Sequence, residues 1–539
     1  MFTLEKIAEY AFISLALALL FLPCTLKMLG ALQQAGYNGR RFAAWTVRKG
    51  NMVYSRFILL AFLIALSSAV LAVVFSFAGD WAAYIALIPF PLFAVLYWVA
   101  DKRSLKVPLV STARAQRVLA LTGVCIFLAA AAFAVGVNAA AYYAEIELIS
   151  HLRYLPLAVL PILLPLLMRA GNALEKPFSS SKNKKYLAAA REKLHAAECV
   201  KIGITGSFGK TSVKNFAAAL LSRKYKVFAT PESYNTPLGI AKAIESVDLG
   251  AYDVFLVEMG ARHKGDIAEL CDLVAPDHCV VTGICPQHVE TFGGIEAVIA
   301  AKGEILLGTK AGGFAFVGMD ENTEKLDASA AKLVKVGVGV HGECGAHDIK
   351  CTENGTEFKL ALGILQTEIH TKLLGAHNAR NIALAAAIAY KLGLSKEEIA
   401  EGAEALDYVP HRLQPYRANG VTILDDAYNA NIVGAKEAVN VLRLFGGRKF
   451  IVTPGLVELG ILEESENAAL GEKLAGLDRV ILVGATLVTA VKRGYLAAGG
   501  DEEKIVVVPT LDKAEELLAE ELAPGDAVLF LNDLPDIYN

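Results

Sequence analysis

The fold of this chain is decided by one stretch, Val200-Lys201-Ile202-Gly203-Ile204-Thr205-Gly206-Ser207-Phe208-Gly209-Lys210-Thr211-Ser212. Val200–Thr205 is a short run of β-forming residues, and Val213–Leu221 repeats apolar residues at helical spacing. Strand, glycine loop and helix in this order form a cradle for phosphate. The glycines let backbone N–H groups close on the anion, and the helix N-terminus adds partial positive charge. We therefore predict a P-loop-type α/β domain that binds ATP.

The individual residues of this loop have predictable roles. Lys210 is expected to contact the β- and γ-phosphates, and Thr211 to hold Mg²⁺. The generic motif has glycine where Ile204 stands, so the spacing departs from the usual pattern. The alternative is a short glycine turn with an incidental lysine. The predicted nucleotide-binding residues of the loop are Gly206, Ser207, Gly209, Lys210, Thr211 and Ser212.

The first 170 residues are far more apolar than the rest. The whole chain is 55% hydrophobic, with a mean hydropathy of +0.44. A helix needs about 20 apolar residues to cross a hydrocarbon core of ~30 Å. We predict about five transmembrane helices within residues 1–170, over Tyr10–Leu26, Phe57–Ala78, Trp81–Ala100, Val118–Tyr142 and Tyr154–Met168.

Basic residues predict how these spans are oriented. They gather after the first, third and fifth spans, and the other loops are short or carry Glu145 and Glu147. The positive-inside rule then gives an external N-terminus and cytoplasmic catalytic domains in a multi-pass cell-membrane protein. The spans serve as an anchor or as a binding site for a lipid-linked substrate. The basic residues are Lys27, Arg40, Arg41, Arg48, Lys49 and Arg56; Lys102, Arg103, Lys106, Arg114 and Arg117; and Lys176, Lys182, Lys184 and Lys185.

Composition also divides the remainder of the chain. The polar, Ser- and Lys-rich residues 171–196 are predicted to be a linker. Residues 197–408 form the central ATP-binding domain, and residues 409–539 alternate strands with helices, which predicts a Rossmann-like C-terminal domain. The formal net charge of -3 gives no basic field, so nucleic acid is not an expected partner. The sequence leaves the oligomeric state open.

Six segments, in order, resemble the Mur ligase family, and most of them its MurF branch. They begin with Ile204–Lys214 (ITGSFGKTSVK), whose spacing the family shares. The others are Val257–Ile267, Gln287–Gly293 (QHVETFG), Ala300–Glu304 (AKGE), Gly375–Asn381 (GAHNARN) and Asp425–Asn431 (DDAYNAN). This resemblance implies an ATP-dependent acid–amino-acid ligase that acts through an acyl phosphate.

The resemblance implies a metal and catalytic set. Glu258, at the end of an apolar strand, suits Mg²⁺ as a hard oxygen ligand. His288 corresponds to a second metal ligand, and Lys302 to a lysine that the family carbamylates. The alternatives are a surface carboxylate, a loop histidine and a solvated lysine. The expected catalytic groups are Lys210, His288, Lys302 and Arg412, and the expected metal ligands are Thr211, Glu258, His288 and Lys302.

Further residues are expected at the nucleotide. Asn378 and Asn381 share one helix face, although Asn378 as a mere helix cap is an alternative. Arg412 corresponds to a family arginine that reaches the ATP phosphates. Asp426 corresponds to the C-terminal-domain aspartate that meets both nucleotide and arginine.

Outside these predicted catalytic, metal-binding and nucleotide-binding residues, the chain departs from the MurF pattern. The spans stand in place of the branch's UDP-binding domain, Glu232–Gly239 only partly resembles its substrate loop, and Ile432 and Leu531–Pro535 differ from its C-terminal pattern. We expect a UDP- or lipid-linked cell-envelope precursor and an amino acid or dipeptide as substrates, in peptidoglycan precursor or related synthesis. The alternatives are a poly-glutamate-type ligase and a membrane ATPase or nucleotide-sensing scaffold.

Overall fold

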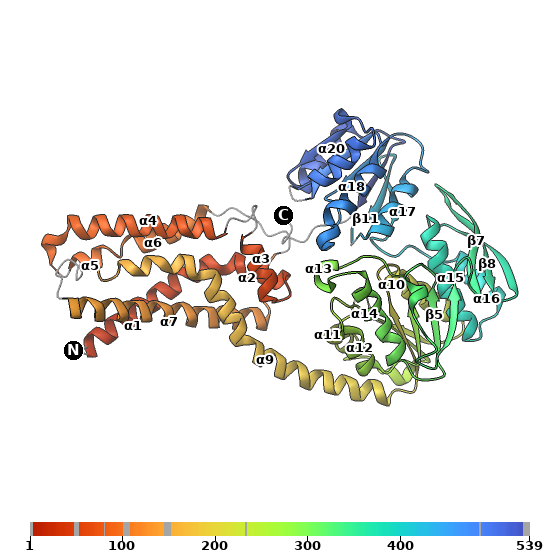
Figure 1. Cartoon of the computed structure of the whole chain (residues 1–539), viewed down its shortest axis with the longest axis horizontal. Helices are drawn as coiled ribbons and strands as arrows, with labels where there is room; N and C mark the ends of the chain where they lie inside the picture. Colours follow the sequence, from red (N-terminus) through yellow and green to blue (C-terminus); the bar gives the residue numbers. More distant parts are fainter. Residues whose placement is uncertain are drawn as a thin grey trace. The chain divides into compact units, whose positions relative to one another are not determined.

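The computed structural model describes residues 4–47, 53–79, 81–100, 108–144, 152–231, 234–428, 430–484 and 487–531. These residues fall into two compact units that divide between Lys182 and Asn183, the first helical and the second α/β (Figure 1). Some predictions concern residues outside these ranges. They involve Arg48, Lys49, Lys102, Arg103, Lys106, Glu145, Glu147, Glu232, Ser233, Asn429 and residues 532–539.

The described part of the first unit is helical. Within it and the helix that leaves it, five helical stretches are long and apolar enough to cross a membrane: Leu4–Gln34, Val53–Val74, Trp81–Val99, Ala113–Gly136 and Leu155–Ala196. Each contains all or most of one predicted span, which confirms the five apolar helices. Their elements are α1 (Leu4–Phe21), η1 (Pro23–Thr25), α2 (Leu26–Gln34), α3 (Gly39–Val47), α4 (Val53–Val74), η2 (Ser76–Ala78), α5 (Trp81–Ile85), α6 (Pro89–Ala100), α7 (Ala113–Ala144), η3 (Leu155–Val159) and α9 (Leu160–Ala196).

Helix α4 shows why these helices suit lipid. Phe57 and Ile64 are fully buried in the helical unit, whereas Leu59 and Phe62 on its other side are 58% and 60% exposed. A helix that is apolar on its exposed side as well as its buried side matches a hydrocarbon environment. The first unit therefore has both an apolar core and an apolar surface.

Residues 171–196, predicted to be a linker, belong to helix α9, and the division between the two units falls within them. The helix continues through Pro165 and Pro177. Lys184–Ala196 (KKYLAAAREKLHA) is rich in alanine, leucine, lysine and arginine, which favour helix strongly enough to override the polar composition. Ala190 and Leu194 then pack into the core of the second unit, so the end of α9 is part of that unit's structure.

The described residues of the second unit include a nine-stranded sheet in the order β2-β3-β1-β4-β5-β6-β7-β8-β9. The strands from β2 to β6 are parallel, and β7–β9 form antiparallel hairpins. The bounds are β1 (Val200–Thr205), β2 (Val227–Ala229), β3 (Val254–Glu258), β4 (His278–Val281), β5 (Phe314–Gly318), β6 (Val334–Val338), β7 (Cys344–Thr352), β8 (Gly355–Leu362) and β9 (Leu365–Thr371).

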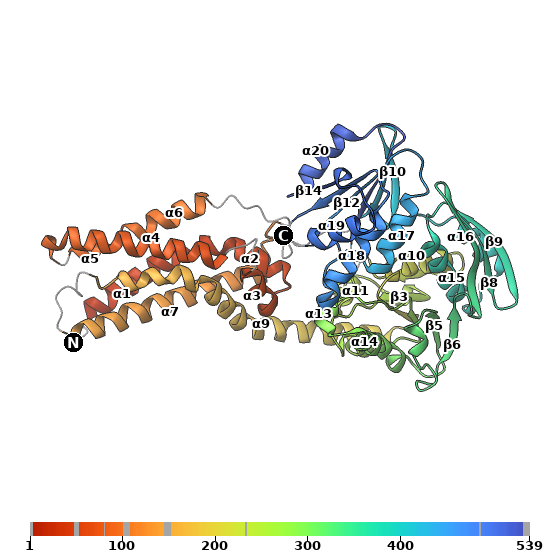
Figure 2. The same ribbon diagram turned by 45° about the horizontal axis from the view of Figure 1, so that its top comes forward.

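Helices cover both faces of this sheet. Leu256 of β3 packs on the same side as α10 (Lys210–Leu221), α15 (Ala376–Lys391) and α16 (Lys396–Glu404). Its neighbours Phe255 and Val257 face α9, α11 (Pro237–Ile244), α12 (Asp266–Val274) and α14 (Ile295–Gly308). This alternation is the period of two expected of a strand. Helices α15 and α16 lie beside β7–β9 in both ribbon views (Figure 2).

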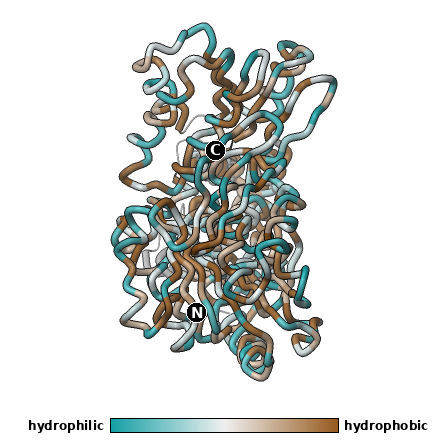
Figure 3. The backbone as a smooth tube through the Cα atoms, turned by 90° about the vertical axis from the view of Figure 1, so that its right-hand side faces the viewer, coloured by the Kyte–Doolittle hydropathy of each residue, from teal (hydrophilic) through white to brown (hydrophobic). Residues whose placement is uncertain are grey.

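A second sheet follows, with six strands among the described residues in the order β10-β11-β15-β12-β13-β14. Of the strand pairs described in it, β10–β11 is antiparallel and the others are parallel. The bounds are β10 (Gln414–Ala418), β11 (Val421–Asp426), β12 (Lys449–Thr453), β13 (Arg479–Val483), β14 (Ile505–Val508) and β15 (Ala527–Leu531), with α17 (Ile432–Leu442), α18 (Glu463–Leu474), α19 (Val488–Ala497) and α20 (Leu511–Glu521). Figure 3 shows the backbone coloured by hydropathy, with brown, apolar stretches alternating with teal, hydrophilic ones.

Candidate active site

The site lies where the parallel strands of the first sheet end. Strand β1 lies between β3 and β4, so the loops that follow these three strands meet at one edge, where α/β sheets place ligands. Two of the pockets in the described residues adjoin there, with volumes of about 440 Å³ and about 610 Å³. We call the smaller one the polar pocket and the larger one the nucleotide pocket.

The phosphate loop takes the conformation that its glycines permit. Gly209 is the N-cap of α10 with φ of 75°, and a Cβ there would lie 2.6 Å from Oδ1 of Asn381. Lys210 donates from Nζ to the carbonyl oxygen of Gly206 at 2.8 Å. Burial lowers the pKa of Lys210, and nearby Glu258 opposes that change. An ammonium in so dry a setting needs an anionic partner, which a phosphate provides.

Ser207 differs from its neighbours in the loop. Its hydroxyl donates to the carbonyl oxygen of Cys285 at 3.0 Å, and its N–H donates to Gly283 at 2.8 Å. Both groups fix the loop against the end of β4. Ser207 also lines the polar pocket, and its role at the nucleotide stays a prediction.

Thr211 and Glu258 form the centre of the polar pocket. Oγ1 of Thr211 donates to Oε2 of Glu258 at 2.9 Å, and Nδ2 of Asn235 donates to Oε1 of Glu258 at 3.1 Å. Lys214, which is fully buried, lies 3.5 Å from the same carboxylate. A hydroxyl and a carboxylate side by side fit Mg²⁺, which takes one or two protein oxygens and fills its remaining positions with water and phosphate.

Asn235 and Lys214 also belong to this site, although neither was predicted as a site residue. Asn235 lies in the loop Glu232–Gly239, whose partial resemblance to the family's substrate loop was the available signal. Lys214 is the last residue of the first family-like segment, which was the available signal, although no role was predicted for it. Its burial against Glu258 makes it part of the site.

Lys302 lies in the polar pocket on helix α14 and is 3% exposed, so it is not a solvated lysine. Burial, and secondarily Lys210, lowers its pKa to about 7. The described residues hold no group of three His, Cys, Asp or Glu side chains placed for a metal. Glu258, His288 and Lys302 all line the polar pocket, so a carbamate on Lys302 would add a carboxylate-like oxygen ligand to those of Glu258 and Thr211.

His288 also lines the polar pocket, with a left-handed backbone (φ 55°). Its Nδ1 contacts Oε2 of Glu458, a residue that the sequence analysis did not single out. Burial lowers the pKa of His288, and the Glu458 carboxylate opposes that change. Glu304 of the AKGE segment has a structural role, because its carboxylate accepts from the N–H groups of Gly265 and Ala268 at 2.7 and 3.1 Å.

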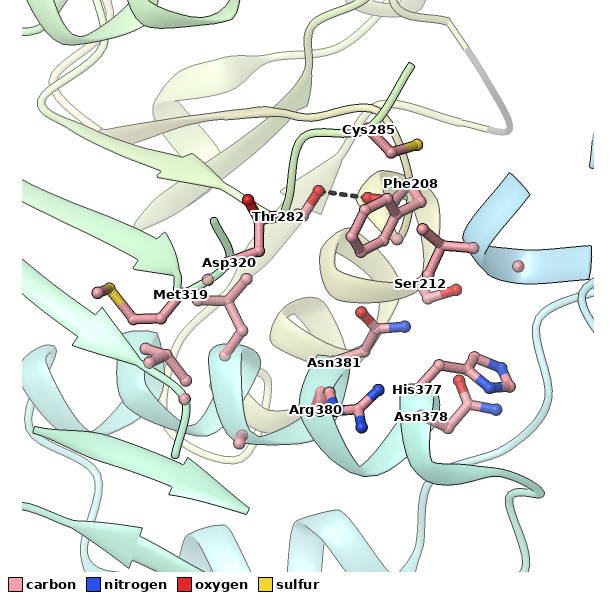
Figure 4. A pocket seen from close by; sticks show the side chains of 18 of the residues that line it. Phe208, Ser212, Thr282, Cys285, Met319, Asp320, His377, Asn378, Arg380 and Asn381 are labelled. Carbon is pink, nitrogen blue, oxygen red and sulfur yellow. Dashed lines mark hydrogen bonds between the residues drawn. The ribbon is translucent and has the colours of Figure 1, made fainter. Parts of the chain in front are cut away.

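The nucleotide pocket is shown in Figure 4. Asn378 and Asn381 rise from α15 beside Phe208 and Ser212 of the phosphate-loop segment. Phe208 is held through its carbonyl oxygen, which accepts from the hydroxyl of Thr282. The alternative that Asn378 caps the helix is wrong, because Gly375 is the N-cap and Asn378 donates to the carbonyl oxygen of Leu374 at 2.9 Å.

Arg412 lines both pockets, and its guanidinium lies 4.5 Å from the centre of the Tyr428 ring. Asp426 lines the nucleotide pocket, and its Oδ1 accepts from the N–H of Leu413 at 3.1 Å. Burial raises the pKa of Asp426 to about 6, although Arg412 acts to lower it. The structure thus brings the predicted arginine, just before β10, and the predicted aspartate, at the end of β11, to the pockets beside the first sheet.

Comparison with known proteins defines the class. The family model of the Mur ligase middle domain matches residues 204–389, and that of the Mur ligase, glutamate ligase domain matches residues 411–532. The chain belongs to the Mur ligase family. Within it, the chain is 31% identical over 339 residues to the UDP-N-acetylmuramoyl-tripeptide--D-alanyl-D-alanine ligase of Bacillus subtilis (strain 168), covering 61% of this chain and 72% of that protein.

Two other proteins of the same family are similar to this chain. The Escherichia coli (strain K12) ligase of the same name is 34% identical over 290 residues, which cover 52% of this chain and 64% of that protein. The crystal structure of MurF ligase from Thermotoga maritima in complex with ADP superposes with a TM-score of 0.58 at 27% identity, covering 66% of this chain and 81% of that chain. The family resemblance predicted from the six segments is confirmed.

Proposed function

We propose that the chain is a membrane-anchored, ATP-dependent amide-bond ligase that acts on a cell-envelope precursor through an acyl phosphate. The observation that carries this activity is the polar pocket, where Lys210, Thr211, Glu258, Lys302 and Arg412 converge from two sheets. Positive charge comes from Lys210 and Arg412, and oxygen ligands come from Thr211, Glu258 and a potential carbamate on Lys302. Phosphoryl transfer needs such cations and metal ligands to stabilise the charge on the phosphate oxygens.

The residues divide the two steps of the reaction between them. The phosphate loop and Lys210 hold ATP while a carboxylate oxygen of the acceptor attacks the γ-phosphorus and ADP leaves. An amine then attacks the acyl carbon, phosphate leaves, and the nitrogen loses a proton. Thr211 and Glu258 would hold Mg²⁺, which neutralises charge on the phosphate oxygens when bound. Arg412 adds positive charge from the second sheet, and Asn378, Asn381 and Asp426 line the nucleotide pocket.

The substrates are proposed from the relatives. Their name gives a UDP-linked muramoyl tripeptide and D-alanyl-D-alanine, so we propose a UDP- or lipid-linked precursor and an amino acid or dipeptide. The C-terminal domain, with its mostly parallel sheet and helices on both faces, is proposed to be Rossmann-like and to deliver the amine. Residues 197–408 and 409–539 are the proposed ligase domains.

The five apolar helices support a multi-pass cell-membrane location. The distribution of Lys and Arg favours an external N-terminus and cytoplasmic ligase domains. In that arrangement the ligase domains have access to ATP.

The test is an acceptor and amine screen with the full chain in detergent or nanodiscs, supplied with ATP and Mg²⁺. UDP-linked, lipid-linked and glutamyl acceptors are combined with single amino acids and dipeptides, and products are read by mass spectrometry. We expect one acceptor–amine pair to yield an amide with one phosphate released per bond. Phosphate release that no acceptor or amine changes would instead identify an ATPase or nucleotide sensor.

A further inference from the structure

Glu458 connects the two sheet domains at the polar pocket. Oε2 contacts Nδ1 of His288, and Oε1 accepts a hydrogen bond from Nη1 of Arg262 at 2.9 Å. Arg262 follows β3 and His288 follows β4, whereas Glu458 lies between β12 and α18 of the second sheet. One carboxylate from the C-terminal domain therefore contacts the segments that follow two neighbouring parts of the central sheet, after β3 and after β4.

The loop that carries Glu458 is rigidly built. Asn467, which is fully buried, accepts from the N–H of Leu456 at 2.8 Å and donates to its carbonyl oxygen at 2.9 Å. It also donates to the carbonyl oxygen of Glu463 at 2.8 Å. Asn467 thus fastens both ends of the loop 456–463. Glu458 itself has a left-handed backbone with φ of 61°, a conformation that persists in non-glycine residues only where surrounding contacts enforce it.

The same loop is fitted to the segment after His288. The N–H of Glu290 donates to the carbonyl oxygen of Glu458 at 3.4 Å. Gly460 has φ of 56°, and a Cβ there would lie 3.1 Å from the nitrogen of Glu290. A side chain at this position would require the loop and helix α13 (Val289–Phe292) to shift by a few tenths of an ångström, so the two backbones pack closely here. A backbone contact with Glu290 and a side-chain contact with His288 therefore both hold Glu458 in place.

This contact decides which nitrogen of His288 carries a proton. A carboxylate accepts hydrogen bonds but does not donate them, so Nδ1 must be the donor. Nε2 of the neutral ring then keeps its lone pair, the form needed to ligate a metal or accept a proton. Histidines that ligate metals usually donate their other nitrogen to such a carboxylate, which fixes the ring.

We propose that Glu458 is a positioning residue that fixes the tautomer and orientation of His288, so that the polar pocket is complete only when the C-terminal domain is docked. This role rests on the proposed function of the site. It assigns the task to a residue that lines neither pocket. Arg262 shares the carboxylate but does not set the histidine tautomer.

The test uses the full chain with ¹⁵N-labelled histidine, and the His288 signals are assigned by their loss in H288Q. In the unsubstituted protein we expect the ¹⁵N shifts of a ring protonated at Nδ1. E458A should give a tautomer mixture and weaken Mn²⁺ binding in the presence of ADP, measured by electron paramagnetic resonance, by about 10- to 100-fold. The Mn²⁺ affinity of E458Q should lie between that of the unsubstituted protein and that of E458A, because its amide oxygen still accepts a hydrogen bond.

Two controls separate this role from others. Glu464 on α18 forms an exposed ion pair with Arg493. E464Q removes the charge of Glu464 and should leave the tautomer of His288 and the affinity for Mn²⁺ unchanged. R262A should keep the Nδ1-protonated ring. If R262A and E458A changed the His288 tautomer and the Mn²⁺ affinity equally, Glu458 would serve only to hold the two domains together. An unchanged His288 tautomer in E458A would overturn the proposal directly. The ¹⁵N shifts and Mn²⁺ binding are measured without acceptor or amine. Both therefore test the role of Glu458 even if the proposed ligase activity is not found.

Discussion

Nδ1 of His411 lies 2.6 Å from Oδ2 of Asp425. On the other side of Arg412, the N–H of Leu413 donates to Asp426 at 3.1 Å. His411 and Leu413 both have left-handed backbones, with φ of 58° and 49°, and each such residue costs about 1–3 kcal/mol. Two consecutive aspartates of β11 therefore hold the strained segment that presents Arg412 to both pockets.

Asp425→Ala is expected to misplace Arg412. Because small errors in position are costly for a group that stabilises transferring phosphate, kcat/KM for ATP should fall roughly 10- to 100-fold. Steady-state kinetics on the identified substrates, with a thermal melt to confirm folding, measure this. Asp407→Ala is the matched control, since Asp407 forms an exposed pair with Lys372 just before the segment. Unaltered kinetics in Asp425→Ala would show that Arg412 is held by other contacts.

Lys210→Ala is expected to abolish ATP-dependent ligation and leave membrane insertion intact. Lys210 lines the polar pocket beside the phosphate loop, whereas the apolar helices lie in a separate unit. Product formation and carbonate-resistant membrane association are the two measurements. Lys335→Ala, on the exposed side of β6, should change neither. Ligation at the unsubstituted rate in Lys210→Ala would remove the loop from the mechanism.

Lys302→Ala should nearly abolish activity, and added short carboxylates should partly restore it by filling the vacated ligand position. Lys302→Arg should be inactive, because a guanidinium stays charged and cannot be carbamylated. ¹³C NMR with labelled bicarbonate detects the carbamate itself. Full activity of Lys302→Arg would reduce Lys302 to a phosphate-contacting cation.

The carbamate should also form in a pH-dependent way. The pKa of Lys302 is lowered to about 7, so the neutral amine that attacks carbon dioxide predominates above that pH. Protein stripped of carbon dioxide should therefore be reactivated by bicarbonate faster at pH 8 than at pH 6, at equal dissolved carbon dioxide. Equal rates at the two pH values would contradict a titrating Lys302.

Asp426→Asn is expected to stabilise the fold while lowering activity. The pKa of Asp426 is raised from 3.8 to about 6 in the folded state, so the folded chain binds this proton more tightly than the unfolded chain. Stability is therefore lost as pH rises from about 4 to about 6. At pH 8 the substitution should add roughly 1 kcal/mol, because partial exposure screens the charge, and at pH 4 it should add almost nothing. Thermal melts at both pH values check this.

A reporter fused after Asn539 should read as cytoplasmic, and one fused before Met1 as external. The expectation follows from the basic residues after the first, third and fifth apolar stretches. Matched fusions to alkaline phosphatase and to a fluorescent protein give opposite signals on the two sides. An external C-terminus would deny the ligase domains ATP and would contradict the proposed function as well.

The sequence by itself determined the parts that depend on local pattern. Hydrophobic run lengths marked the five apolar helices, and the strand–glycine–helix order of residues 200–221 marked the phosphate loop, because both are properties of neighbouring residues. The strands of the second sheet, from Val421 to Leu531, were likewise visible as short β-branched runs. Polar composition also marked residues 171–196, within which the two units divide, whereas their helical conformation follows from helix propensity.

Only the tertiary structure decided which distant side chains meet. Asn235 and Lys214 join Glu258, and Glu458 reaches His288 across 170 residues of sequence. The lowered pKa of Lys302 and the raised pKa of Asp426 follow from burial among particular neighbours. A sequence pattern records residue types and spacing along the chain. Desolvation and hydrogen bonding depend on which surfaces the fold brings into contact, and those are fixed only when the sheets and helices pack.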